Sequence, residues 1–264
     1  MLEIKNIYKT FNPGTINEKV ALNGLSLKLN EGDFVTVIGG NGAGKSTMLN
    51  AVAGVWPVDE GQIIIDGTDV TKLSEYKRAA YLGRVFQDPM TGTAATMGIE
   101  ENLALAKRRE KTRFLRSGIT KAEREEYKEL LKILNLGLED RLTSKVGLLS
   151  GGQRQALTLL MATLQKPKLL LLDEHTAALD PKTAAKVLDI TDRIVNRDHL
   201  TTLMITHNMK DAIAHGNRLI MMMNGKIILH IQGEEKKKLT VKQLLDKFEE
   251  ASGEEFSNDS AILG

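Results

Sequence analysis

The stretch GGNGAGKST constrains the fold of this chain more than any other part of the sequence. It fits the pattern G-x-x-x-x-G-K-[ST], with Gly39, Gly44, Lys45 and Ser46 at the fixed positions, and it follows the apolar run FVTVI at 34–38. The glycines of such a loop let successive backbone N–H groups point at one anion, and the following helix adds its positive end. The pattern therefore predicts a buried strand, a phosphate-binding loop and a helix in direct succession.

All nine loop residues are expected to surround the phosphates of a nucleotide. They are Gly39, Gly40, Asn41, Gly42, Ala43, Gly44, Lys45, Ser46 and Thr47. In such a loop the lysine, Lys45, reaches the β- and γ-phosphates and the Ser46 hydroxyl ligates Mg²⁺. We expect Thr47 to bond the α-phosphate.

Further apolar runs indicate the rest of the core. KLLLLDE at 168–174 and TTLMITH at 201–207 are apolar until their C-terminal ends, as parallel strands covered on both faces are. Helical stretches separate them, which predicts an α/β fold: a P-loop NTPase core with a mainly parallel sheet. RLIMMMNGKIILHI at 218–231 contains Asn224-Gly225 and predicts a hairpin. With the strand GQIIIDG at 61–67, we expect it to form a small antiparallel sheet flanking the parallel one.

Residues from about 88 to 165 are expected to form a helical subdomain. Thr120 and Glu123 form a capping box before a helical apolar repeat, for which Gly137 is the expected stop. The charge-rich segment before this helix, 107–118, is predicted to be an exposed connection.

The whole chain, 1–264, is expected to form a single domain. Its core and antiparallel strands would take 1–87 and 166–232, and a short helix and polar tail would take 233–264. Thr240 and Gln243 repeat the capping pattern at the start of that helix.

Composition limits the function. The 264 residues carry a formal net charge of +2, which does not favour a nucleic-acid surface. No cysteine is present, so disulfides and thiolate metal sites are excluded. No apolar run approaches the roughly 20 residues needed to span a bilayer. Any membrane role is therefore expected to come through a partner.

Two carboxylates follow the second buried strand. Asp173 is expected to hold Mg²⁺ through water, because an acid at the end of a buried strand is costly unless it serves a cation. Glu174 points elsewhere and is placed to polarise the attacking water as a general base.

A second loop with the character of an anion site lies about a hundred residues after the first, in LLSGGQRQ. Its residues Ser150, Gly151, Gly152 and Gln153 precede a helix that we expect to start near Gln153. If two copies meet head to tail, this loop faces the γ-phosphate bound by the other copy. The site would then be complete only in a dimer.

These motifs together resemble the ATP-binding subunit of an ABC transporter over roughly residues 2–232. The matching segments are Walker A (39–47), the LSGGQ signature (149–153), Walker B (169–173) with Glu174, the D-loop AALD (177–180), the switch histidine His207 and the Q-loop glutamine Gln87.

The resemblance implies ATP and Mg²⁺ as ligands. It implies that Phe11 stacks on adenine, with Tyr8 as the alternative. It also implies that Gln87 contacts Mg²⁺ or the attacking water and that His207 bonds the γ-phosphate. Asp180 is implied to work across the dimer interface. His175 stands where many relatives have proline.

The implied partners are a twin copy, an integral membrane permease and an extracytoplasmic solute-binding protein, with the chain on the cytoplasmic face of the cell membrane. DEHTAALDP at 173–181 and FQDPMTGTAATMGIEENLALA at 86–106 together resemble ATPases paired with small-solute importers of bacteria, including some for aromatic amino acids. The resemblance therefore implies import of a small solute. An exporter ATPase of the lipoprotein or peptide type, and a soluble ATPase acting on ribosomes or DNA, are the alternatives. The solute itself is not encoded in these residues.

Overall fold

The computed structural model describes residues 1–109 and 118–252. The predicted polar tail and most of the charge-rich connection at 107–118 lie outside the described residues. No helix among the described residues is long and apolar enough to cross a membrane.

A six-stranded sheet forms the centre of the molecule. Its strands, in spatial order, are β10 (Lys226–Gln232), β9 (Arg218–Met223), β3 (Phe34–Ile38), β8 (Thr201–Ile205), β7 (Leu169–Asp173) and β6 (Leu82–Val85). All neighbouring strands from β9 to β6 run parallel, and β10 pairs antiparallel with β9. The predicted mainly parallel sheet is confirmed.

A separate antiparallel sheet forms from the N-terminal part of the chain. Its strands, in spatial order, are β2 (Lys19–Leu29), β1 (Leu2–Phe11), β4 (Glu60–Ile65) and β5 (Thr68–Asp69). The Asn224-Gly225 hairpin is confirmed, with both residues at positive φ (48° and 73°), but its expected sheet was wrong. Because β9 pairs parallel with β3, the hairpin extends the central sheet instead of joining the flanking one.

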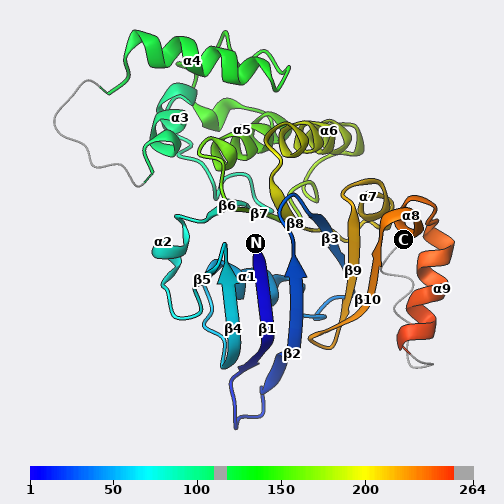
Figure 1. The fold of residues 1–264 in the computed structure, drawn as a ribbon. Coiled ribbons are helices and arrows are strands. Elements are labelled where there is room, and N and C mark those ends of the chain that lie inside the picture. Colours follow the sequence, from blue (N-terminus) through cyan, green and yellow to red (C-terminus); the bar gives the residue numbers. More distant parts are fainter. Residues whose placement is uncertain (110–117, 253–264) are drawn as a thin grey trace.

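Helices cover both faces of the central sheet. They are α1 (Lys45–Ala53), α2 (Glu75–Arg78), α3 (Ile99–Lys107), α4 (Lys121–Lys132), α5 (Gly151–Thr163), α6 (Pro181–Asp198), α7 (Met209–Ala214), α8 (Gly233–Lys237) and α9 (Val241–Ser252), with a 3₁₀ turn at Val146–Leu148. Figure 1 shows α3, α4, α5 and α6 as a layer above the sheet, and the antiparallel strands below it.

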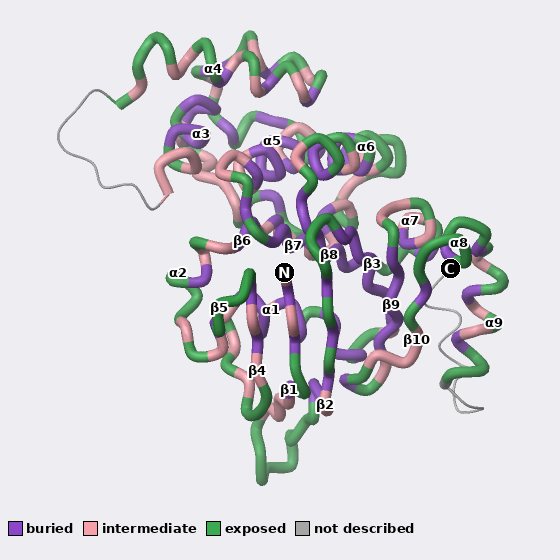
Figure 2. Tube along the Cα trace, in the orientation of Figure 1, coloured by how far each residue is buried: buried purple, intermediate pink, exposed green. Residues whose placement is uncertain are grey.

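Three apolar clusters hold these layers together. One joins the antiparallel sheet, α1 and one face of the central sheet; a second joins α3 to α6 with the other face; a third lies between the β9–β10 hairpin, α7 and α9. In Figure 2 the central strands are buried along almost their whole length, whereas α4 is largely exposed. The P-loop helix α1 is thus fixed between two sheets.

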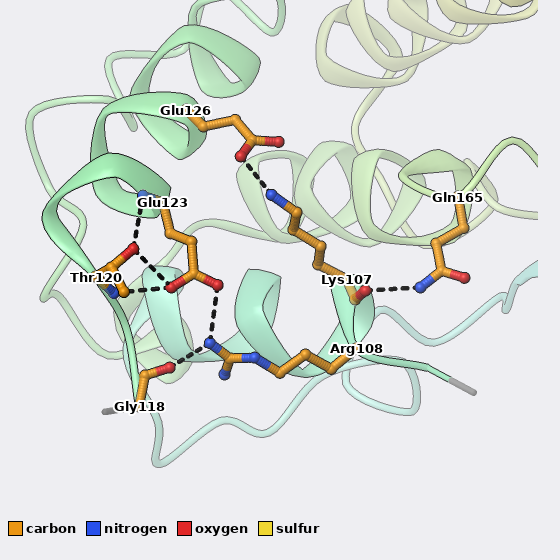
Figure 3. A network of polar contacts seen from close by, with 7 residues as sticks. All are labelled: Lys107, Arg108, Gly118, Thr120, Glu123, Glu126 and Gln165. Carbon is orange, nitrogen blue, oxygen red and sulfur yellow. Dashed lines mark hydrogen bonds and ion pairs between the residues drawn. The ribbon is translucent and has the colours of Figure 1, made fainter. Parts of the chain in front are cut away.

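The capping box at the start of α4 is confirmed. Glu123 N–H donates to Thr120 Oγ1 (3.2 Å), and the Thr120 N–H donates to Glu123 Oε2 (2.8 Å). Figure 3 shows how this turn is tied to α3: Arg108 contacts Glu123 (3.2 Å) and Lys107 contacts Glu126. These polar contacts add to the apolar packing of α4, which places Tyr127 and Leu131 in the second cluster.

The expected stop of α4 at Gly137 was wrong. The helix ends at Lys132, and Asn135 takes the left-handed conformation (φ 52°) two residues before Gly137 does (φ 66°). Asn tolerates this conformation better than other side chains, so the chain turns before it reaches the glycine. At the C-terminus the prediction holds: Thr240 and Gln243 cap α9, which packs Leu244 and Phe248 into the third cluster.

Candidate functional site

The phosphate loop joins β3 to α1, as predicted. Gly39 and Gly44 have φ of 149° and 99°. A Cβ at Gly39 would lie 2.3 Å from the Met222 carbonyl oxygen, and one at Gly44 would lie 2.5 Å from that of Ala21. Only glycine fits at either position, because both the backbone conformation and the neighbouring backbone exclude a side chain.

Lys45 begins α1 and is buried, with 8% of its surface exposed. Its Nζ donates to the carbonyl oxygens of Gly39 (2.7 Å) and Gly40 (3.2 Å), so the loop curls around the ammonium group. Burial lowers the pKa of Lys45, an effect that the nearby Glu174 and Asp173 oppose. An ammonium group has three donors, so these two bonds leave one N–H of Lys45 for a further partner.

A pocket of about 240 Å³ opens over this loop. Its lining residues are Phe11, Lys19, Ala21, Asn41, Gly42, Ala43, Gly44, Lys45, Ser46, Thr47 and Glu174. Most predicted loop residues are thus brought together with Phe11 and Glu174, whereas Gly39 and Gly40 contribute carbonyl oxygens to Lys45. Lys19 was missed in the sequence. A Cβ built on Gly42 would lie 3.3 Å from the Lys19 Nζ, so a second ammonium group stands at the loop.

Phe11 lies at the end of β1 and lines the pocket, whereas Tyr8 does not. A Cβ built on Gly24 would lie 2.9 Å from the Tyr8 hydroxyl oxygen, which places Tyr8 against β2. The Phe11 ring meets Trp56 edge-on, with centroids 5.0 Å apart, and Lys9 Nζ lies 5.7 Å from the Phe11 centroid. Of the two predicted aromatic residues, only Phe11 therefore lines this pocket.

Asp173 ends β7 beside the loop. Arg84 of β6 reaches its Oδ2 (3.5 Å) and also donates to Asn50 Oδ1 on α1 (2.8 Å). Burial raises the pKa of Asp173, and Glu174 raises it further, while Arg84 and Lys45 act against this rise. No sequence pattern pointed to Arg84.

Glu174 directly follows β7 in the left-handed conformation (φ 44°). Its N–H donates to the Ile205 carbonyl oxygen (3.0 Å), which fixes its backbone to the end of β8. His207 follows β8, and its Nδ1 lies 3.7 Å from Glu174 Oε2. The two side chains are thus neighbours, at a distance longer than a hydrogen bond.

Gln87 lies in an exposed loop after β6 and does not line the pocket. Beside this loop is a groove of about 270 Å³ between the core and the helical layer. Its lining residues are Ala53, Glu75, Ala79, Leu82, Arg84, Phe86, Gly92, Ala106, Arg109, Thr158, Met161 and Ala162. Arg84 therefore touches both the groove and Asp173.

The second loop forms the N-terminus of α5. Ser150 caps the helix by accepting from the Gln153 N–H (3.3 Å), and Gln153 Oε1 accepts from the Ser150 N–H (3.2 Å). The helix begins at Gly151 and not near Gln153, because this capping box satisfies the first turn two residues earlier than expected. None of the four predicted signature residues lines the pocket over the phosphate loop of their own chain.

The signature turn packs against α6. A Cβ built on Gly152 would lie 2.1 Å from Thr183 Cγ2, and one on Gly151 would lie 3.1 Å from Leu179 Cδ2. Asp180 caps α6 by accepting from the Thr183 N–H (3.1 Å), with Pro181 as the first helical residue. Asp180 is therefore the N-cap of α6.

Comparison with known proteins identifies the family. The model described as "ABC transporter" matches residues 22–177, which is more than half of the chain. The tyrosine transport ATP-binding protein of Clostridioides difficile (strain R20291) is 46% identical over 256 residues, covering 95% of this chain and 100% of that protein. The chain belongs to the ABC transporter family.

Two further relatives of this ABC ATPase are import ATP-binding proteins. The xylose/arabinose import ATP-binding protein of Sulfolobus acidocaldarius is 33% identical over 249 residues, covering 94% of each chain. The methionine import ATP-binding protein of Bartonella henselae is 33% identical over 232 residues, covering 86% of this chain but only 64% of that protein.

Solved ABC cassettes share the fold. A dimeric cassette in a post-hydrolysis state with ADP and Pi matches with a TM-score of 0.74 and 30% identity, over 88% of this chain and 98% of that one. An ADP-bound cassette matches with a TM-score of 0.76 and 27% identity, over 94% and 98%. The predicted family, α/β cassette fold and ATPase activity are confirmed.

Proposed function

We propose that this ABC ATPase drives uptake of an amino acid, of the aromatic class, through a membrane permease. The 46% identity to a tyrosine transport ATP-binding protein, which extends over that protein's whole length, carries the choice of solute class. Family membership implies the permease. An extracytoplasmic solute-binding protein would deliver the solute, and the ATPase would sit on the cytoplasmic face of the membrane.

Nucleotide binding is assigned to the pocket over the phosphate loop. Phe11 stacks on adenine, the N–H groups of 41–47 surround the phosphates, and Lys45 pairs with the terminal ones. The support for this assignment is that Phe11, the loop and Glu174 line one pocket.

A Mg²⁺ ion fits the residues beside the loop. Mg²⁺ is usually held by one or two carboxylates together with substrate phosphates and water, not by an all-protein cage. Asp173 and the Ser46 hydroxyl supply this oxygen set, and among the described residues no cluster of three or more His, Asp or Glu groups offers a cage. When bound, the ion would offset the charge of the phosphates.

Hydrolysis is assigned to three side chains around the γ-phosphate. Glu174 polarises the attacking water as general base, and His207, 3.7 Å from it, bonds the γ-phosphate and keeps the water in line. Gln87 contacts Mg²⁺ or the water when its loop moves toward the pocket.

The reaction centre is completed by a second copy. Ser150, Gly151, Gly152 and Gln153 lie away from their own pocket, and the first turn of α5 presents N–H groups to an anion. Two copies placed head to tail would bring this turn to the other copy's γ-phosphate. Loss of that phosphate on hydrolysis would release the pair and drive the permease through the groove beside Gln87.

The test begins with the purified chain. Mg²⁺-dependent ATP hydrolysis is expected, as is ATP-driven dimerisation of Glu174→Gln. Lys45→Ala should abolish nucleotide binding, whereas Gly151→Ala should keep it and stop hydrolysis. Gly151→Ala protein that lost ATP affinity as a monomer would contradict the role in trans.

The solute class needs the whole complex. The chain is to be pulled down from membranes with its permease, and ATP hydrolysis by the reconstituted complex measured with tyrosine, phenylalanine and methionine. Stimulation by methionine alone would overturn the aromatic class and leave the ATPase assignment intact.

A further inference from the structure

His175 is a buried imidazole directly after Glu174, and the function proposed above gives it no role. Only 2% of its surface is exposed. Burial lowers its pKa to about 4, and the nearby His215 contributes to the shift. The imidazole is therefore neutral at physiological pH.

One hydrogen bond fixes the form of this imidazole. His175 Nε2 lies 3.1 Å from Thr191 Oγ1, and Thr191 is 1% exposed. The Thr191 hydroxyl donates to the Val187 carbonyl oxygen (2.9 Å), so its single proton is already used. Thr191 Oγ1 must accept from His175, which makes His175 the Nε2–H tautomer.

This bond ties the segment that carries Glu174 to the middle of α6. The Glu174 N–H is bound to Ile205 of β8 (3.0 Å), and the Glu174 carbonyl oxygen accepts from the Ala177 N–H (2.9 Å). His175 is one peptide bond away and extends in the other direction, into α6. The backbone of Glu174 is thus held between the end of a central strand and an 18-residue helix.

Helix α6 is a firm reference for this segment because its first turn is packed as well. Thr183 lies against Gly152 so closely that a Cβ there would approach to 2.1 Å. The same helix therefore contacts the segment of the general base through Thr191 and the signature turn through Thr183.

We propose that His175 is a positioning residue whose hydrogen bond to Thr191 fixes the Glu174 carboxylate for attack on ATP. This role rests on the assignment of Glu174 as general base. The backbone of Glu174 is left-handed, so the direction of its side chain depends on how the next peptide, between Glu174 and His175, is oriented. The hydrogen bond of His175 to Thr191 holds that peptide in place.

The matched pair Thr191→Val and Thr191→Ser tests the bond in the full chain. Valine keeps the shape and removes the acceptor, whereas serine keeps the hydroxyl. Thr191→Val should lower kcat by about ten- to a hundredfold, since a displacement of ~1 Å at a reacting group can cost on the order of 10²-fold. Its KM for ATP and its affinity for a fluorescent ATP analogue should stay at the wild-type values, as should all parameters of Thr191→Ser.

A second pair guards against loss of folding at position 191. The amide of His175→Gln can donate to Thr191, whereas His175→Leu cannot. The glutamine variant should retain more kcat than the leucine variant. In a Glu174→Gln background, Thr191→Val should leave ATP-driven dimerisation unchanged, because the carboxylate that it would displace is absent.

The outcomes separate this role from simpler ones. A Thr191→Val protein with lower thermal stability and wild-type kcat would make the bond structural only. If Thr191→Val lost ATP affinity, or lost dimerisation in the Glu174→Gln background, the substitution would act on ATP binding and not on the position of the carboxylate. If the wild type hydrolysed no ATP, the proposed function itself would fail; an active wild type with an equally active Thr191→Val would overturn only the positioning role.

Discussion

Arg84 Nη2 lies 3.5 Å from Asp173 Oδ2, and this pair joins the Walker B strand to the groove beside the helical layer. Both side chains are largely buried, with 14% and 17% exposed. Burial lowers the pKa of Arg84 and raises that of Asp173, so each charge depends on the other. A permease segment that displaced Arg84 from the groove would therefore change the charge balance at the proposed Mg²⁺ site.

Removal of the Arg84 charge is expected to destabilise the free protein. Arg84→Met should lower the free energy of unfolding by about 3 kcal/mol at pH 7, because it leaves Asp173 buried without its partner and next to Glu174. As pH falls through the raised pKa of Asp173, the carboxyl becomes neutral and the difference from wild type should shrink. Denaturant titrations at pH 7 and at a series of lower pH values measure both effects.

Arg193→Met is the control for this prediction. Arg193 pairs with Asp189 on the exposed face of α6 (3.0 Å), where ion pairs contribute little. An Arg84→Met protein as stable as this control would show that Asp173 needs no partner.

Contact between the signature turn and α6 predicts that a substitution at Gly152 can be compensated by one at Thr183. Gly152→Ala should stop hydrolysis and keep ATP binding, because its Cβ would lie 2.1 Å from Thr183 Cγ2 and displace the turn. Thr183→Ser removes that methyl group and keeps the backbone N–H that Asp180 caps. The double variant should recover ATP hydrolysis in a phosphate-release assay. Failure of the rescue would mean that the alanine acts on something other than Thr183.

Lys19 is expected to contribute to nucleotide affinity. Lys19→Gln should weaken ATP binding by about two- to fivefold, which corresponds to one solvent-accessible charge pair of up to about 1 kcal/mol. The loss should be smaller in high salt, because exposed charges are screened. Titration with a fluorescent ATP analogue measures it. Lys28→Gln is the control, since Lys28 lies on the same strand and pairs with Glu3 (3.5 Å); equal affinities in the two variants would refute the role.

The parts of the site that the sequence predicted are those in which neighbouring residues carry the information. The phosphate loop, the Asn224-Gly225 turn and the capping boxes at Thr120 and Thr240 are each defined within about nine residues, because backbone conformation and local hydrogen bonds decide them.

Residues that reach the site through strand pairing could not be found in this way. Lys19 enters the pocket because it pairs with Phe11 across β1 and β2, and Arg84 meets Asp173 because β6 lies beside β7. The sheet to which the Asn224-Gly225 hairpin belongs was predicted wrongly for the same reason, because the neighbours of a strand are set by residues far away in the sequence. The Asn-Gly turn defines how β9 and β10 pair with each other, but the neighbour of β9 is set by the register Val35 to Arg218 across the fold.

His175 is expected to make the protein less stable in mild acid. Its folded pKa of about 4 lies below the ordinary value of 6.5, so between these values the unfolded chain binds a proton that the folded chain excludes. The contribution of His175 to the free energy of unfolding is therefore fully present above about pH 6.5 and is lost as pH falls toward 4. The loss between pH 7 and pH 5 is about 2 kcal/mol. His175→Gln has no imidazole to protonate, so its free energy of unfolding should fall less over that range by about this amount.

Thr191→Val keeps the buried imidazole, and burial is the main cause of the lowered pKa, so this variant should retain the wild-type pH slope at lower overall stability. If denaturant titrations showed the same change of the free energy of unfolding with pH for wild type and His175→Gln, another group would be responsible for the loss of stability in acid.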